Sequence, residues 1–357
     1  MNTFGRNIKL SFFGETSSPF FGLSIDGIKP GVAININKIN ESLNRYEDSN
    51  ITWKFSSGII GGFTTGSPIT ILIENSDPNI KFKNGIIVPS TSDLVIKEKY
   101  KGFNDFIDEG HFSLKSINLF IILGEICKQI LKDECIIVIT RIKSIKDIQD
   151  KKLKFAEINV GNLISLHSSD FPVLDDRAKQ AMKSIIKKAR EIKDTVGGTI
   201  ETFIFNSPKS LGEPYFDGFD SILSHLLFSF NFIKGIEFGD GLELTQKYGS
   251  KTIDEIVYKN DKIVYLSNHQ GGIDAGITNG NPIIFTTSIR PSPKMPRILY
   301  SIDTLSKQNI EISNITDYKI TNIYDAIKLI DSLSHYIILD FLIDKQKIGG
   351  ISRWKSW

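Results

Sequence analysis

Five short segments rich in glycine and polar residues are the places where this chain could do chemistry. Glycine permits positive φ angles and close approach of the backbone, which a planar or phosphorylated ligand exploits. Polar loops between core elements are also where binding and catalytic residues gather. The segments are Phe13–Ser18 (FGETSS), Gly61–Ser67 (GGFTTGS), Leu211–Phe216 (LGEPYF), Gly239–Gly241 (GDG) and Ser267–Gly280 (SNHQGGIDAGITNG). Taken one at a time, each segment also fits ordinary turn chemistry.

The sequence lacks the motifs of several common sites. It contains neither the phosphate loop G-x-x-x-x-G-K-[ST] nor the dinucleotide fingerprint G-x-G-x-x-G. H-E-x-x-H is absent too, and the five histidines are scattered at positions 111, 167, 225, 269 and 335. With only two cysteines, Cys127 and Cys135, the sequence predicts no disulfide framework and no four-thiolate metal site. We therefore expect a protein that binds a small molecule and holds no metal.

Composition and charge exclude other classes of partner. The chain has 357 residues, with 43 basic and 41 acidic side chains and a net charge of +2. This balance gives no electrostatic footprint for nucleic acid or for an anionic membrane. The longest apolar stretch, Ile117–Cys127, is interrupted by polar residues and is far shorter than the roughly 18 residues of a membrane span. The opening residues lack the apolar core of a signal peptide, so we expect a soluble, cytoplasmic protein.

The elements that must position these loops are of both kinds. Apolar residues recur with the 3.6-residue period of helices in Lys115–Lys132, Asp175–Lys193, Phe219–Phe230 and Ile323–Leu342. β-branched runs of strand length occur at Pro68–Glu74, Cys135–Ile142, Thr199–Phe205, Ile233–Phe238 and Pro282–Ile289. Gly197 and Gly198 suit the exit of the second helix. Runs that are apolar on both faces predict elements sandwiched within a thick core, although periodicity alone does not order the strands.

The glycine-rich segments occur in a particular order, with further motifs between them. N-T-F-G and F-G-E open the chain, followed by I-D-G-x-x-P-G at 25–31 and G-x-T-T-G-x-P-I at 62–69. L-G-E-P begins at residue 211 and is followed by N-x-x-K-G and G-D-G within 231–241. S-N-x-x-G-G at 267–272 then precedes R-P-S at 290–292. In this order the motifs resemble those of the chorismate synthase family, from residue 2 to about residue 343.

The resemblance implies both a fold and a reaction. The fold is α+β, a β-α-β sandwich with helices between antiparallel sheets, formed by one domain over residues 1–357 and assembled as a homotetramer. The reaction is elimination of phosphate from 5-enolpyruvylshikimate-3-phosphate to give chorismate, in the shikimate pathway that leads to aromatic amino acids. The family requires reduced FMN, although the reaction has no net redox change. The flavin stacks on the substrate, assists departure of phosphate from C3 and helps remove hydrogen from C6.

The resemblance also assigns binding residues. The positions that match the family's flavin-binding motifs are His111, Ser113, Asn231, Phe232, Gly271, Gly272, Ala275, Arg290, Pro291 and Ser292. Arg290 keeps a positive charge and Ser292 a hydroxyl for a phosphate, whereas the ring of Phe232 replaces an alanine and is large enough to fill flavin space. Glu15 and Arg45 are the expected substrate-binding residues. Arg45 is what remains of an arginine-rich stretch, so recognition of the anionic substrate is reduced.

The departures from the family pattern fall on the residues that handle protons. The family's two histidines align with Ser17 and Thr91, and its aspartate aligns with Ser313. Hydroxyls do not titrate near neutral pH as imidazole does, and a positioned acid or base contributes about 10²- to 10⁴-fold in rate. We therefore expect no intact catalytic residue and an impaired or altered activity.

A change of charge accompanies these losses. Asp108 and Glu109 replace two glycines beside the expected phosphate site. They would repel a phosphate unless Lys99, Lys101 or Arg290 offsets their charge.

Three hypotheses about function remain open at this point. The chain is a divergent enzyme in which His111 and His269 substitute for the lost groups, or it is a non-catalytic scaffold, a pseudoenzyme that serves in binding or assembly. Alternatively it is a paralogue that binds a different flavin or phosphorylated metabolite, in a pocket reshaped by Phe112, Tyr46 and Phe232. Whether the chain is an enzyme stays undecided by its sequence.

Overall fold

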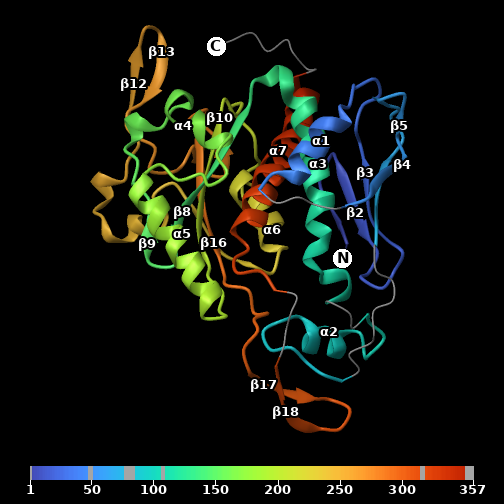
Figure 1. The fold of residues 1–357 in the computed structure, drawn as a ribbon. Coiled ribbons are helices and arrows are strands. Elements are labelled where there is room, and N and C mark those ends of the chain that lie inside the picture. Colours follow the sequence, from blue (N-terminus) through green and yellow to red (C-terminus); the bar gives the residue numbers. More distant parts are fainter. Residues whose placement is uncertain (1, 47–50, 76–84, 106–108, 314–317, 350–357) are drawn as a thin grey trace. The chain divides into compact units, whose positions relative to one another are not determined.

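The computed structural model describes residues 2–46, 51–75, 85–105, 109–313 and 318–349 (Figure 1). The chain folds into two compact units, each made of three separate segments. Unit 1 comprises Met1–Ile126, Ile186–Val196 and Pro291–Thr321, and unit 2 comprises Cys127–Ile185, Gly197–Arg290 and Asn322–Trp357. Each unit contains its own five-stranded antiparallel sheet.

The sheet of unit 1 has the strand order β1-β2-β3-β7-β4. Its strands are β1 (Thr3–Phe4), β2 (Lys9–Phe13), β3 (Phe20–Asp26), β4 (Trp53–Ser57) and β7 (Ile69–Glu74). In the register of β3 and β7, Phe21 pairs with Ile73 and Leu23 pairs with Ile71, and all four side chains are buried. Alternate residues of a strand point to the same face, so this pairing gives the sheet one apolar face.

Helices and short hairpins complete unit 1. The helices are α1 (Ile36–Asn44), α2 (Asp93–Lys99) and the first part of α3 (Ile117–Ile130). The hairpins are β5 (Ile59–Ile60) with β6 (Phe63–Thr64), and β17 (Leu299–Asp303) with β18 (Gln308–Ile312). Two short 3-10 helices, Gly110–Phe112 and Leu114–Ser116, lead into α3, and a third, Leu131–Glu134, follows it. The helix predicted at Lys115–Lys132 is thus α-helical in its central part.

The sheet of unit 2 has the strand order β11-β16-β10-β8-β9. Its strands are β8 (Ile137–Ile145), β9 (Ile148–Gln149), β10 (Gly198–Phe205), β11 (Ile233–Phe238) and β16 (Ile283–Ile289). Strands β8, β10, β11 and β16, together with β7 of unit 1, confirm the five strands predicted from β-branched runs, with ends that differ by a few residues. Two hairpins follow β11, namely β12 (Ile256–Lys259) with β13 (Lys262–Tyr265), and β14 (Ile273–Asp274) with β15 (Ile277–Thr278).

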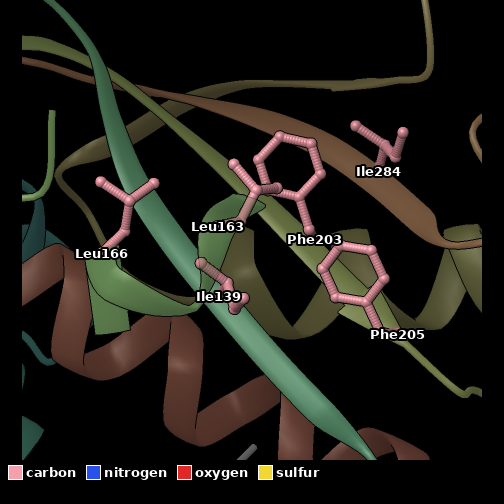
Figure 2. Packing of buried hydrophobic residues seen from close by; sticks show 6 residues of the cluster. All are labelled: Ile139, Leu163, Leu166, Phe203, Phe205 and Ile284. Carbon is pink, nitrogen blue, oxygen red and sulfur yellow. The ribbon is translucent and has the colours of Figure 1, made fainter. Parts of the chain in front are cut away.

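Helices pack against this sheet and explain why its strands are apolar. They are α4 (Val160–His167), α6 (Phe219–Phe228) and α7 (Ile323–Gly349). The unit also contains most of α5 (Asp176–Glu191), which continues into unit 1, and 3-10 helices at Phe155–Glu157, Gly241–Gln246 and Gly249–Lys251. Leu163 and Leu166 of α4 pack with Ile139 of β8 and with Phe203 and Phe205 of β10 (Figure 2). Helix α7 also contacts β8 and β10. Strand β8 therefore has helical neighbours in addition to its sheet partners, which accounts for its nearly continuous burial.

One expectation about glycines was wrong. Gly198 does not serve the exit of α5, because that helix ends at Glu191 and Gly198 is the first residue of β10. A Cβ at Gly198 would lie 2.1 Å from the carbonyl oxygen of Ser144 on β8. The residue is glycine because two strands approach each other closely there.

No helix among the described residues is long and apolar enough to cross a membrane.

Candidate functional site

In unit 1, the loop between β2 and β3 is fixed by hydrogen bonds to a distant segment. Oγ1 of the buried Thr16 donates to the carbonyl oxygen of Gly110 at 2.9 Å. The backbone N–H of Ser17 donates to Oδ2 of Asp105 at 2.8 Å, and the side chain of Ser17 is exposed. Ser17, the first position predicted to align with a family histidine, therefore lies beside the segment that precedes α3.

Thr91, the second such position, lies in the turn that leads into α2. Its Oγ1 donates to the carbonyl oxygen of Val88 at 2.7 Å and accepts from the backbone N–H of Asp93 at 3.3 Å. Both hydrogen bonds of this hydroxyl therefore stabilise its own turn. It does not titrate near neutral pH and so does not replace an imidazole as a proton carrier.

The carboxylate of Glu109 brings two further segments of unit 1 together. Its Oε2 accepts from the backbone N–H and from Oγ of Ser92, at 3.2 and 2.7 Å. Nζ of Lys294 lies 3.5 Å from Oε1. The Glu109 side chain is only 8% exposed, and its backbone has the left-handed φ of 64°.

The electrostatics of this cluster differ from the sequence-based expectation. Lys294, the cation that pairs with Glu109, was not among the cations that the sequence indicated for this role. Burial raises the pKa of Asp93, the charge of Glu109 raises it further, and Lys294 opposes this rise. Asp108, the other acidic residue expected here, lies outside the described residues.

His111 follows this cluster directly in the chain. Its Nε2 lies 3.4 Å from the hydroxyl of Tyr100, and its ring packs on Phe112 with a centroid distance of 4.0 Å. Burial lowers the pKa of His111 below the ordinary value of 6.5; Glu15 acts to raise it and Lys99 to lower it. The imidazole is therefore neutral at neutral pH, in which form it can accept a proton.

Two hydroxyls that the family resemblance assigns to the flavin are buried in unit 1. Oγ of Ser113 accepts from the backbone N–H of Lys115 at 3.4 Å. Oγ of Ser292 accepts from the backbone N–H of Lys294 at 3.3 Å, and its carbonyl oxygen accepts from Oγ1 of Thr195 at 2.8 Å. Both serines thus stabilise turns of their own segments.

Other expected residues of unit 1 lie nearer its surface. The guanidinium of Arg45, a half-buried residue, lies 4.8 Å from the centroid of the neighbouring tyrosine ring. Pro291 is exposed, and Ser313 is exposed directly after β18. The neighbouring residues 47–50 and 314–317 lie outside the described residues.

The glycine-rich segment Gly61–Ser67 has a structural role. Its Thr64 is buried, and Oγ1 of this residue donates to the carbonyl oxygen of Lys29 at 2.7 Å and accepts from the backbone N–H of Val32 at 2.9 Å. These bonds tie the β5–β6 hairpin to the loop before α1.

In unit 2, the backbones of Gly239 and Gly271 lie too close together for any side chain. A Cβ on Gly239 would lie 2.0 Å from the carbonyl oxygen of His269, and one on Gly271 would lie 2.4 Å from the nitrogen of Gly239. Oδ1 of Asn268 accepts from the backbone N–H of Gly272 at 2.7 Å and holds the second segment in place. The segments G-D-G and S-N-H-Q-G-G therefore form one local structure.

This local structure carries a histidine paired with a carboxylate. Nδ1 of His269 lies 2.7 Å from Oδ2 of Asp240, which also accepts from Nζ of Lys247. Oδ1 of Asp254 accepts from the backbone N–H of His269 at 2.7 Å. Partial burial alone would raise the pKa of Asp240, but the hydrogen bonds from Lys247 and His269 outweigh it and lower that pKa. Such a carboxylate fixes the tautomer and orientation of the imidazole.

A third glycine-rich segment, Leu211–Phe216, joins the same loops. A Cβ on Gly212 would lie 2.2 Å from the carbonyl oxygen of Gly276, and the backbone N–H of Phe219 donates to that oxygen at 2.7 Å. Ala275, which the motif comparison aligned with a family glycine, adopts a left-handed φ of 50° and is exposed. Three of the five segments that the sequence singled out thus meet in unit 2.

The last group of expected residues lies where β11 meets β16. The backbone N–H of Arg290 donates to the carbonyl oxygen of Phe232 at 2.9 Å. The side chain of Phe232 is 1% exposed, and its ring centroid lies 6.3 Å from that of Phe230. Asn231 beside it is half-buried.

Several supporting residues were missed by the sequence analysis. They are Ser92, Asp105, Lys247, Asp254 and Lys294. Only Lys294 carried a usable signal, since it is a cation two residues after an expected phosphate-binding serine. Among the described residues, no group of three or more histidine, cysteine, aspartate or glutamate side chains is arranged to hold a metal ion.

Antiparallel sheets with helices packed against them, joined by glycine-rich loops that gather polar groups, define an α+β protein. A family profile described as chorismate synthase matches residues 8–343. The chain therefore belongs to the chorismate synthase family, as the resemblance of its motifs predicted.

Individual relatives cover almost the whole chain. Chorismate synthase of Thermococcus kodakarensis is 27% identical over 363 residues, which cover 98% of this chain and 99% of the relative. That of Pyrococcus abyssi is 30% identical over 355 residues, which cover 95% and 97%. A crystal structure of chorismate synthase aligns with a TM-score of 0.77 and 24% identity, over 96% of this chain and 93% of that one. The structural likeness confirms the predicted fold.

The family's flavin carries a phosphate group, and the donors around Glu109 do not fit an additional one. Ser92 and Lys294 already contact the carboxylate of Glu109. A phosphate brought to the same donors would lie within a few ångströms of that carboxylate, and two anions at this separation repel each other strongly inside a protein. At this place the residues fit a carboxylate and not the phosphate of FMN.

Proposed function

We propose that this chain acts in the shikimate pathway as a chorismate synthase-family protein with strongly reduced turnover. Its reaction is the elimination of phosphate from 5-enolpyruvylshikimate-3-phosphate to give chorismate. The proposal rests on the residues at the two positions that motif comparison aligned with the family's histidines, namely Ser17 and Thr91. The first is an exposed hydroxyl, and the second is hydrogen-bonded within its own turn.

The expected loss follows from acid–base chemistry. A proton carrier must change its protonation state near the working pH, and a hydroxyl does not. Each positioned acid or base contributes about 10²- to 10⁴-fold, so the loss of even one lowers kcat by at least about 100-fold. Histidines proposed for partial compensation are the neutral His111 in unit 1 and, in unit 2, His269, which is paired with the carboxylate of Asp240.

Restoring the histidines tests the proposal. The double variant Ser17→His and Thr91→His is expected to form chorismate at least about 100-fold faster than the wild type. The assay is anaerobic and uses chemically reduced FMN over a range of concentrations, so that kcat is separated from the affinity for the flavin. Ser165→His, at an exposed position of α4 in unit 2, is the matched control and should leave the rate unchanged. A double variant that is folded but no faster than the wild type contradicts the proposal.

A second candidate function is a non-catalytic scaffold, or a paralogue that binds a different flavin or phosphorylated metabolite. The buried ring of Phe232 and the buried carboxylate of Glu109 favour it, because both stand where the family has small residues. A folded wild-type protein that binds neither FMN nor 5-enolpyruvylshikimate-3-phosphate in calorimetric titrations would support this function instead.

The proposal also includes the family's context. Its cofactor is reduced FMN, bound without the donors of Ser92 and Lys294, which contact Glu109 instead. Its substrate is a phosphorylated small molecule, and its form is a single domain in a homotetramer. We place the protein in the cytoplasm, with neither nucleic acid nor a membrane as its partner. Light scattering of the purified protein tests the tetramer, since a monomer or dimer at micromolar concentration contradicts it.

A further inference from the structure

Three hydrogen-bond donors in unit 1 converge on a single anionic group. The backbone N–H and the hydroxyl of Ser92 both donate to Oε2 of Glu109. The ammonium of Lys294 forms an ion pair with Oε1 of the same carboxylate at 3.5 Å. A hydroxyl, an amide and an ammonium aimed at one anion are also the donors that bind a phosphate group. The anion that they bind here is part of the chain.

Glu109 keeps this position against a conformational cost. Its φ of 64° is left-handed, which for a residue with a side chain costs about 1 kcal/mol or more. Its side chain is also almost completely removed from water. A buried carboxylate in a strained backbone persists only where its contacts compensate, so the three donors are what hold it.

Both charges of the pair are largely buried, which makes the arrangement selective. The Lys294 side chain is 23% exposed and that of Glu109 is 8% exposed. An incoming phosphate must either displace the carboxylate from its donors or share them with it. Each route weakens the binding of the phosphate.

We propose that Glu109 is a specificity-determining residue, an internal competitor that occupies the donors of Ser92 and Lys294 and excludes a ligand's phosphate group from them. The inference rests on the proposed function only for the identity of that ligand, a phosphate monoester such as FMN. Removal of the carboxylate converts the same donors into a phosphate-binding site.

Calorimetric titration of the full chain tests this inference. The probes are inorganic phosphate, FMN and riboflavin, which has the same ring system as FMN but no phosphate. Glu109→Gly removes both the charge and the side chain and suits the left-handed backbone, so it should bind inorganic phosphate and FMN at least about tenfold more tightly than the wild type. Riboflavin affinity should not change.

Two further variants complete the test. Glu109→Gln keeps the shape of the side chain and removes only its charge. It replaces the glycine variant in this test if that variant does not fold, and we expect a smaller gain in affinity for phosphate and FMN. Adding Lys294→Gln to either variant should abolish the gain. Glu98→Gln, an exposed residue of α2, is the matched control for the change in net charge.

The inference is overturned if folded Glu109 variants bind phosphate no better than the wild type, if riboflavin gains as much affinity as FMN, or if the gain survives the loss of Lys294. Because the readout is binding, a negative result here is distinct from a failure of the proposed reaction, which is judged by chorismate formation.

Discussion

Oδ2 of Asp240 lies 2.7 Å from Nδ1 of His269, across two loops that are 29 residues apart in the chain. With the carboxylate ionised, Nδ1 carries the proton and donates it to this bond, which leaves Nε2 as the basic nitrogen of the ring. Lys247 donates to the same oxygen. In unit 2 the carboxylate thus orients an imidazole and joins two of the glycine-rich segments.

Replacing Asp240 with asparagine should destabilise the protein in a way that depends on pH. The folded-state pKa of Asp240 is lowered below 3.8, because the bonds from Lys247 and His269 outweigh the effect of burial. A lowered pKa contributes stability above the unfolded-state pKa, and that stability is lost as the pH falls through the folded-state value. We expect Asp240→Asn to lose about 1 kcal/mol at pH 7 in urea unfolding, and the difference to shrink below about pH 4. A difference that is constant down to pH 3 would contradict this account.

A side chain at Gly239 should disrupt the contact between the two loops. Its Cβ would meet backbone atoms, the carbonyl oxygen of His269 at 2.0 Å and the nitrogen of Gly271 at 2.6 Å. We expect Gly239→Ala to cost about 2 kcal/mol or more in the free energy of unfolding. Gly249→Ala is the control, because nothing lies within 4 Å of its Cβ position, and it should change stability by less than about 0.5 kcal/mol. Equal effects of the two variants would contradict the packing described for these loops.

Arg141, on β8, holds two carboxylates in the interior of unit 2. It is 1% exposed, pairs with the fully buried Asp150, and donates through Nε to Oε2 of Glu201 at 2.8 Å. Arg141→Met leaves both carboxylates without this cation, so we expect a loss of about 3–5 kcal/mol in urea unfolding. The exposed Lys146, replaced in the same way, should cost less than about 1 kcal/mol. A loss at Arg141 as small as that at Lys146 would show that the buried network is not needed for stability.

The imidazole of His111 provides a spectroscopic test in unit 1. NMR titration of its ring should give a pKa below 6.5, chiefly because the ring is partly buried. Glu15 acts to raise this pKa, so Glu15→Gln should lower it further. Lys99 acts in the opposite sense, and Lys99→Gln should raise the pKa. Shifts of the reverse sign would place the two charged groups elsewhere relative to the ring.

How much of this structure can be predicted from the sequence depends on how far apart in the chain the interacting residues lie. The period of Asp175–Lys193 predicted α5 to within two residues at each end, because amphipathic spacing is local. The role of Gly198 was misjudged, since the close approach of β10 to β8 depends on a strand more than 50 residues away. Motif order predicted the family correctly, because it integrates many local signals.

The polar clusters needed the three-dimensional structure. Ser92, Glu109 and Lys294 span about 200 positions of the chain, so no spacing rule could unite them. The sequence predicted that Glu109 adds negative charge where a phosphate was expected, but it did not identify Lys294 as the cation that pairs with this carboxylate. The loss of proton-handling residues at Ser17 and Thr91 is a prediction from motif comparison, whereas the use of the Thr91 hydroxyl in its own turn is a structural finding.

The most direct test of the central claim is the anaerobic rate of chorismate formation by the wild-type protein. It is measured beside the chorismate synthase of Pyrococcus abyssi, with reduced FMN and 5-enolpyruvylshikimate-3-phosphate raised until neither rate increases further, and with circular dichroism to show that both proteins are folded. We expect a kcat at least about 100-fold lower for this chain, because hydroxyls stand at the two positions that we propose to align with the family's histidines. A kcat within tenfold of that relative would contradict this expectation.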